Sequence, residues 1–253
     1  MTDRDRVRDD RLIGYVRANG NSSVATLSRE FGVGSSTIRR DLQRLAREGR
    51  LVRTYGGATI AERPADNAPA GAIRGLAEKR RVAAAAADLV HDGQTIVITS
   101  GSTAVEFARQ LTDRRQLTVI TNSLDVAQVL LDSEGIQLVV LGGVIRPRMH
   151  SLLGHLTEQA CRELRADTLF MGIGAISLER GLMNDYMPEI LTDRALRSMA
   201  TSVVVMADAG KFDLVAPALV FGLDEVDVIV TDSGVRPEVV KDLTARAIRV
   251  IVA

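Results

Sequence analysis

The spacing of apolar residues changes once along the chain, and this change predicts two domains joined by a linker. Up to about residue 60, apolar positions recur every three or four residues, which is typical of short amphipathic helices. Beyond about residue 75, short runs of Val, Ile and Leu alternate with helical segments. The stretch between them has no period and contains two prolines and two glycines. We therefore expect an N-terminal domain at 5–60, a linker at 61–75 and a larger C-terminal domain at 76–253.

The N-terminal domain is predicted to hold three helices and a short ribbon. Apolar spacing indicates helices at 6–17, at 22–31 after a serine cap, and at 35–48. A tight turn with two glycines separates the last two, which is the arrangement of a helix-turn-helix at about 22–41. The alternating stretch at 51–55 and the glycine pair after it predict a strand and a turn. Together these elements indicate a winged helix-turn-helix.

Seven short strands are predicted in the C-terminal domain. Their ranges are 95–99, 117–121, 136–141, 168–171, 203–206, 226–231 and 248–252. Because these runs are apolar on both faces and alternate with helices, we predict an α/β domain with a mostly parallel sheet covered on two sides. In such sheets, ligands bind at the carboxyl ends of the strands.

The composition, with 46% hydrophobic and 25% charged residues over 253 positions, is that of a globular protein. No apolar run reaches the roughly 18 residues that a membrane span needs. The first ten residues are too charged to form the apolar core of a signal peptide. We therefore expect a cytoplasmic protein with no membrane partner. Cys161 is the only cysteine, which excludes an internal disulfide, and it is expected to be a small buried residue.

The charge is divided unevenly along the sequence, although the formal net charge is zero. Residues 1–63 hold 13 Arg against 8 Asp and Glu, which gives +5. Residues 64–253 hold 19 Lys and Arg against 24 Asp and Glu, which gives −5. A basic N-terminal domain beside an acidic C-terminal domain fits a DNA-binding head attached to a domain of another function.

The residue types at the start of the third helix suit DNA recognition. Short polar side chains such as Ser35–Thr37 can approach base edges, and arginines around them contact phosphates and guanine. The three residues could instead only cap the helix, and Arg40 could pair with Asp41 on the surface. On the ribbon, Arg53 could meet phosphate or the minor groove, or remain solvated. The predicted DNA contacts are Ser35, Ser36, Thr37, Arg39, Arg40, Arg44 and Arg53.

Polar and glycine residues follow several of the predicted strands, where a ligand site is expected. Ser100–Thr103 combine backbone N–H groups with hydroxyls at a helix start, which favours phosphate, although such residues also serve as plain helix caps. Lys211 would add positive charge. Asp185, Tyr186 and Glu189 could bind hydroxyls, although Tyr186 could equally pack in the core. The predicted effector contacts are Ser100, Gly101, Ser102, Thr103, Asn122, Gly142, Gly143, Asp185, Tyr186, Glu189 and Lys211.

Several motifs resemble the DeoR family of sugar-operon repressors, over almost the whole chain. In the N-terminal domain they are Thr37-Ile38-Arg39-Arg40-Asp41-Leu42 and Gly56-Gly57-Ala58. In the C-terminal domain they include Lys79, Thr121-Asn122-Ser123 and Asp208-Ala209-Gly210-Lys211-Phe212. Within the family, the branch that represses glycerol-3-phosphate genes is most similar in the segment with Asp185-Tyr186, Glu189, Thr192 and Arg194.

The resemblance implies a function, partners and a fold for the sensor domain. The protein would repress a sugar or polyol catabolic operon, bind double-stranded operator DNA, and be released by a phosphorylated sugar or polyol. It would form a dimer or tetramer and need no cofactor. Its sensor domain would be similar in fold to ribose-5-phosphate isomerase.

Four positions depart from the pattern that the resemblance leads us to expect. Gly34 stands where the recognition helix usually starts with serine, and Thr99 where an aspartate commonly precedes the glycine loop. Gly210 replaces a serine, which removes a hydroxyl that could donate to a ligand. Asp193 replaces a lysine or arginine near the expected ligand cleft. The bound metabolite is therefore expected to differ from that of other members.

Two other functions remain open from the sequence. The first is a sugar-phosphate isomerase, in which Glu189 would be the general base by resemblance. The loop at 172–177, where such isomerases carry aspartates, has no acidic residue, so no catalytic residue is predicted. The second is an activator or architectural DNA binder without an effector. The spacing of His91, His150 and His155 does not suit a metal, and no metal site is predicted.

Overall fold

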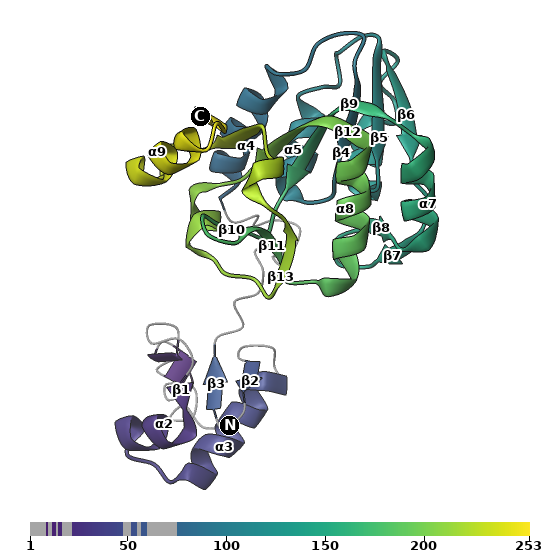
Figure 1. Ribbon diagram of the computed structural model, residues 1–253. Helices are drawn as coiled ribbons and strands as arrows, with labels where there is room; N and C mark the ends of the chain where they lie inside the picture. The colour runs from purple at the N-terminus through teal and green to yellow at the C-terminus, as the bar shows by residue number, and fades with distance from the viewer. Residues whose placement is uncertain are drawn as a thin grey trace. The chain divides into compact units, whose positions relative to one another are not determined.

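The computed structural model divides into two compact units, Met1–Asn67 and Ala68–Ala253. The structure describes residues 9, 12–13, 15–16, 22–47, 52–54, 57–59 and 75–253. Figure 1 draws both units and labels their helices and strands.

The N-terminal unit is built around a helix-turn-helix. Its two helices are α2 (Val24–Phe31) and α3 (Ser35–Arg47). The hydroxyl oxygen of Ser23 caps α2 by accepting a hydrogen bond from the Thr26 backbone N–H at 3.1 Å. Helix α2 ends at Gly32, whose left-handed φ of +63° turns the chain toward α3. The buried core of this unit contains Leu12, Ile13, Val16, Val24, Leu27, Ile38, Leu42, Leu45 and Ala58.

Three short antiparallel strands complete the unit. They are β1 (Ser22–Ser23), β2 (Val52–Thr54) and β3 (Gly57–Thr59), in the order β1-β3-β2. The sequence did not predict β1, because two residues carry no periodicity. The predicted first helix is helical at the five of its positions that are described, and its remaining positions lie outside the described residues. The predicted turn at Gly56 lies outside them as well.

The C-terminal unit contains a seven-stranded parallel sheet in the order β15-β14-β12-β9-β4-β5-β6. In chain order the strands are β4 (Thr95–Ile98), β5 (Leu117–Thr121), β6 (Ile136–Val140), β9 (Ala166–Gly172), β12 (Ala200–Met206), β14 (Val228–Thr231) and β15 (Arg249–Val252). Each of the seven apolar runs in the sequence forms one of these strands. The predicted parallel α/β fold is therefore confirmed.

Helices cover both faces of this sheet, so that the unit has three layers (Figure 1). On one face α4 (Leu76–Ala87), α5 (Ser102–Arg109) and α6 (Leu124–Leu130) share a core with the sheet. On the other face the core includes α7 (His155–Glu163), α8 (Ile190–Met199) and α9 (Pro237–Ala245). The stacked rings of Phe107 and Phe170, with centroids 4.5 Å apart, join α5 to β9 at the centre of the first core.

Two small antiparallel sheets follow the carboxyl ends of the large sheet's strands. The hairpin of β7 (Val144–Arg146) and β8 (Ser151–Leu153) follows β6. A three-stranded sheet in the order β10-β11-β13 follows β9 and β12. Its strands are β10 (Ala175–Ser177), β11 (Gly181–Asn184) and β13 (Ala218–Phe221), and the short 3-10 helices are η2 (Met187–Glu189), η3 (Ala209–Asp213) and η4 (Leu223–Glu225). The sequence predicted none of these elements, although they shape the end where the ligand was expected.

None of the helices in the described part of the chain is long and apolar enough to cross a lipid bilayer.

Candidate DNA-binding surface and effector site

The first turn of α3 presents short polar side chains to solvent. Ser35 and Ser36 are exposed, and Thr37 is half-buried. The backbone N–H of Thr37 bonds to the carbonyl of Gly34 at 2.9 Å, so Gly34 leads directly into the helix. A side chain at Gly34 would approach only the hydroxyl of Ser36, at 3.9 Å. This end of α3 is thus open to a partner, as a recognition helix requires.

The arginines of α3 divide into two groups. Arg39 and Arg40 are exposed beside the polar first turn. Arg44 instead binds both carboxylate oxygens of Asp9, at 2.9 and 2.7 Å, and it lies 3.6 Å from Asp41. The structure therefore gives Arg44 protein partners, where the sequence predicted a DNA contact. The alternative considered from the sequence, a surface pair of Arg40 with Asp41, is not found in the described structure, and Asp41 contacts Arg44.

Arg53 lies on β2, and its side chain is outside the described part of the structure. Its contact with DNA therefore stays a prediction.

The glycine loop after β4 forms an open helix start. Gly101 has a φ of +121° and precedes α5, and a side chain there would meet no atom within 4 Å. No side chain caps the first N–H groups of α5. The hydroxyl-bearing residues Ser102 and Thr103 are half-buried and buried at this turn. Open N–H groups at a helix start next to hydroxyls suit an anion such as phosphate.

Thr99, which precedes this loop, is buried and has a structural role. Its hydroxyl oxygen accepts a hydrogen bond from the backbone N–H of Gly172 at 3.3 Å, which ties β4 to the end of β9. An aspartate was expected here from the resemblance, and the threonine leaves this part of the sheet end uncharged.

Asn122, at the end of β5, is 1% exposed and binds the β7–β8 hairpin. Its side-chain NH₂ donates to the backbone carbonyl of Leu152 at 3.2 Å, and the backbone carbonyl of Asn122 accepts from the Leu152 N–H at 2.7 Å. Its Oδ1 is buried and has no hydrogen-bond partner in the described structure. A buried acceptor without a partner is costly, which is an indication of a missing donor.

The pair Gly142-Gly143 directly precedes the hairpin and packs against Thr157 and Leu153. The hydroxyl of Thr157 donates to the carbonyl of Gly142. Gly143 has a φ of +149°, and a side chain there would lie 2.2 Å from the Thr157 hydroxyl and 2.7 Å from the Leu153 carbonyl. The sequence predicted a ligand contact at both glycines. The structure gives Gly143 a packing role, because only glycine fits there.

A buried charged cluster forms where the hairpin meets η2. Glu189 is 6% exposed, and its Oε2 accepts from Nη1 of Arg146 at 2.6 Å. Its Oε1 accepts from the hydroxyl of Ser151 at 3.2 Å. The guanidinium of Arg146 also stacks 4.1 Å above the ring of Tyr186. Tyr186 therefore stacks on Arg146, and its ring lies on the surface rather than in the core.

A second carboxyl adjoins this cluster. Asp193, on α8, is 5% exposed, and its Oδ2 accepts from the side-chain NH₂ of Asn184 at 2.8 Å. The Oδ1 of Asn184 in turn accepts from the Gly174 N–H at 2.9 Å, which fixes the amide. Burial and the nearby charge of Glu189 raise the pKa of Asp193 well above its usual value.

The same surroundings shift the pKa of Glu189 in opposite directions. Burial raises the pKa of Glu189, and the positive charge of Arg146 and the hydrogen bonds partly oppose that rise. Asp185, which is exposed, adds a smaller repulsive effect. The cluster thus holds two buried carboxyl groups with one arginine beside them. Arg146 and Ser151 were not predicted from the sequence, because they lie on two strands of only three residues, which were not predicted either.

The loop after β12 carries Lys211 on η3, where it is half-buried. Within the described structure, its ammonium makes no hydrogen bond or ion pair with a protein group. The loop is held by Asp232, whose carboxylate accepts from the N–H groups of Ala209 and Gly234 at 2.7 and 2.9 Å. A side chain at Gly210 would lie 3.1 Å from Oδ1 of Asp208. Lys211 is therefore available to an anion at this end of the sheet.

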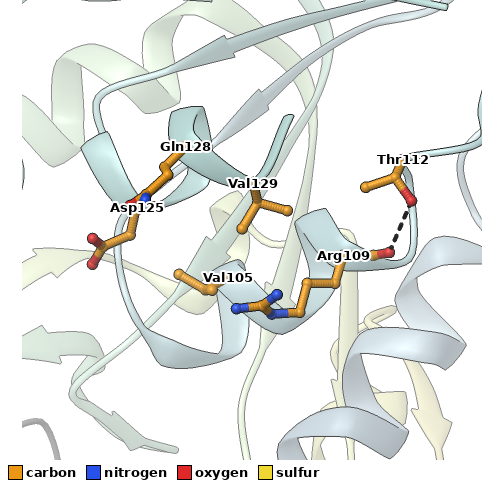
Figure 2. Close-up of a pocket in the computed structure, with 6 residues that line it drawn as sticks. All are labelled: Val105, Arg109, Thr112, Asp125, Gln128 and Val129. Atoms are coloured by element: carbon orange, nitrogen blue, oxygen red, sulfur yellow. Dashed lines mark hydrogen bonds between the residues drawn. The ribbon is translucent and has the colours of Figure 1, made fainter. Parts of the chain in front are cut away.

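A groove lies elsewhere, between α5 and α6 (Figure 2). It has a volume of about 670 Å³ and is lined by Val105, Arg109, Thr112, Asp125, Gln128 and Val129. None of the predicted effector residues lines it. The polar residues that line it are exposed or half-buried.

His150 and Cys161 both have a structural explanation. His150 pairs with Asp125 at 2.8 Å on the surface. Cys161 is buried, and burial raises the pKa of its thiol to about 11, so it is unreactive. Among the described residues, no three side chains of His, Cys, Asp or Glu come together to hold a metal ion.

Family models match both units. Residues 8–63 match the DeoR-like helix-turn-helix domain, and residues 75–233 match the DeoR C-terminal sensor domain. The first match includes helix α3, and the second includes the strand ends described above.

Full-length relatives are transcriptional regulators. The chain is 33% identical to the transcriptional repressor AccR of Agrobacterium fabrum, with 90% of each chain covered. It is 29% identical to the glycerol-3-phosphate regulon repressor of Escherichia coli, with 94% of each covered. The sensor unit also resembles ribose 5-phosphate isomerase A of Methanocaldococcus jannaschii, with 23% identity, a TM-score of 0.42 and 55% of each chain covered. These regulators and the family models favour gene regulation over catalysis.

Proposed function

The chain belongs to the DeoR family of transcriptional regulators, and from this premise we propose that it represses a sugar or polyol catabolic operon. Family membership makes it a DNA-binding regulator and not an enzyme. In our proposal a phosphorylated intermediate of the same catabolic route binds the sensor domain and releases the protein from its operator. A repressor acts on the chromosome, so we place it in the cytoplasm.

The DNA-binding half of the proposal is supported by the exposed face of α3. Ser35 and Ser36 are open to base edges, and Arg39 and Arg40 flank them. The excess of positive charge in residues 1–63 favours contact with the phosphate backbone. We propose that Arg44 acts indirectly, because its pair with Asp9 holds α3 against the first helix.

One observation supports the proposed binding of an effector. Groups suited to the phosphate and groups suited to the hydroxyls of a sugar phosphate follow the carboxyl ends of strands in one sheet. The open start of α5 at Gly101 and the ammonium of Lys211 suit the phosphate. The cluster of Glu189, Arg146 and Ser151 offers acceptors and donors for hydroxyl groups. Since parallel strands end at the same edge, these groups face one ligand region.

The proposed unit of action is a dimer or tetramer. One winged head buries too little surface for tight operator binding, and paired heads would read two half-sites. We propose that residues 5–60 form the head, residues 61–75 the linker, and residues 76–253 the sensing and assembly domain. Light scattering that finds only monomers at micromolar concentration would remove this part of the proposal.

Two variants test the division of labour between the units. Replacing Arg39 and Arg40 together by alanine should weaken specific operator binding at least about tenfold, because each base contact contributes roughly 1–3 kcal/mol. Lys211→Ala should bind the operator normally and need a higher concentration of phosphorylated ligand for release. Fluorescence anisotropy measures both. A normal ligand response in Lys211→Ala would show that the phosphate site is misplaced.

A further inference from the structure

The two buried carboxyl groups of the sensor domain exceed the positive charge that faces them. Asp193 faces Glu189 on η2 and Arg146 on β7, and its hydrogen-bond partner Asn184 on β11 is neutral. Arg146 is already bound to Glu189 at 2.6 Å. On α7, Glu158 lies 3.4 Å from the hydroxyl of Thr192 and adds no positive charge. An ionised Asp193 is therefore left without a counter-ion.

A buried carboxylate without a counter-ion is costly, and two remedies exist. In the empty site a proton on Asp193 would remove the charge, and burial together with the charge of Glu189 shifts the pKa of Asp193 upward, in that direction. In the bound site a ligand can bring the missing positive charge. A ligand that carries only hydroxyl groups would bring no such charge.

When Asp193 is ionised, its surroundings also have more hydrogen-bond acceptors than donors. Only Oδ2 of Asp193 has a partner in the described structure, while its Oδ1 has none. The buried Oδ1 of Asn122 also lacks a partner. Asn122 lies beside the cluster, because it bonds to Leu152 and the adjacent Ser151 bonds to Glu189. A ligand that completes this site must therefore donate hydrogen bonds.

A metal ion fits these observations less well than an organic cation. Among the described residues no three ligating side chains come together here. A primary ammonium carries one positive charge and three N–H donors, so it can satisfy a carboxylate and neighbouring acceptors together.

On the basis of the function proposed above, we infer that the effector is an amino-sugar phosphate, whose ammonium group binds Asp193 beside Glu189. The phosphate would occupy the helix start at Gly101 and the ammonium of Lys211. The Asp193 carboxyl then discriminates between an amino sugar and the corresponding sugar with a hydroxyl group at that carbon.

Matched pairs of ligands test this inference on the full-length protein. The 6-phosphates of glucosamine, galactosamine and mannosamine are each compared with those of glucose, galactose and mannose by isothermal titration near neutral pH. At least one amino compound should bind about tenfold or more tightly than its hydroxyl partner, as expected for a charge-assisted hydrogen bond. Equal binding within every pair, preference for the hydroxyl compounds, or no binding by any of the six overturns the inference.

Proton release gives a second readout that needs no variant. If an ammonium replaces the proton of Asp193, binding of the amino compound should release close to one proton, and binding of a hydroxyl compound should release none. The apparent binding enthalpy should then depend on the ionisation enthalpy of the buffer only for the amino compound. A buffer-independent enthalpy for a preferred amino compound would place its ammonium away from Asp193.

The variant Asp193→Asn completes the test. Asparagine can still accept the hydrogen bond of Asn184 but carries no charge, so the preference for the amino compound should fall by about tenfold. An unchanged preference overturns the role of Asp193. The proposed function is judged separately, since hydroxyl sugar phosphates that release operator DNA would leave it standing while the inference fails.

Discussion

At the scale of single residues, charged pairs determine what each part of the molecule can do. The Arg44–Asp9 pair shows how a residue type suited to DNA can be used for structure instead. Asp9 is 1% exposed, and its carboxylate depends on the two hydrogen bonds from Arg44. The sequence could not reveal this pair, because the partners are 35 positions apart and Asp9 stands in a run of charged residues.

Arg44→Ala is expected to destabilise the head by about 2 kcal/mol, because it leaves a buried carboxylate without its partner. The exposed Arg40 provides a matched control, and Arg40→Ala should change the free energy of unfolding by less than about 0.5 kcal/mol. Urea unfolding followed by circular dichroism measures both. Equal stability of the two variants would show that the Asp9 pair does not support the head.

Asp193→Asn should alter the pH dependence of stability. Because the pKa of Asp193 is raised in the folded state, the folded protein binds this proton more tightly than the unfolded chain does. The wild type should therefore lose stability as pH rises from the unfolded pKa, about 4, through the raised folded value. The variant lacks this loss. Its stability relative to the wild type should grow with pH in denaturant unfolding, and a constant difference would contradict the raised pKa.

At the scale of elements, the strands of the large sheet were predictable from the sequence, and the three-residue strands of the β7–β8 hairpin were not. All seven strands of the large sheet are apolar runs that the sequence displays directly. The β7–β8 hairpin has strands of three residues, too short for a period to be recognised. It nevertheless contributes Arg146 and Ser151 to the charged cluster. Apolar pairs on both sides of the 147–150 turn were the available signal, and only pairing in space makes it meaningful.

The hairpin also depends on the glycine pair before it, and Gly143→Ala tests this. The added methyl group would overlap the Thr157 hydroxyl and the Leu153 carbonyl at a φ of +149°, so a loss of about 2 kcal/mol or more is expected. At Gly142 a side chain would meet no atom within 4 Å, so Gly142→Ala should cost less than about 1 kcal/mol. Thermal unfolding compares them, and similar midpoints would contradict the assigned packing role.

At the scale of the whole molecule, the chain forms two units that differ in net charge and in the spacing of apolar residues. The sequence predicted both, because a change of apolar spacing and of net charge extends over many residues. It also showed polar residues after several strands, and their contact with a ligand stays a prediction. It could not predict which of them face a ligand, since Gly143 and Tyr186 have packing and stacking roles that depend on neighbours distant in the chain.

We propose that one phosphorylated compound controls the contact of this protein with DNA. The most direct measurement is fluorescence anisotropy of the DNA upstream of its own gene, near 0.15 M salt, where nonspecific attraction is weakened. The labelled DNA and protein are titrated with phosphorylated sugars and with the same sugars lacking phosphate. We predict specific binding that one phosphorylated compound releases and that its unphosphorylated form leaves intact. Tight binding that no phosphorylated sugar or polyol alters would contradict the account.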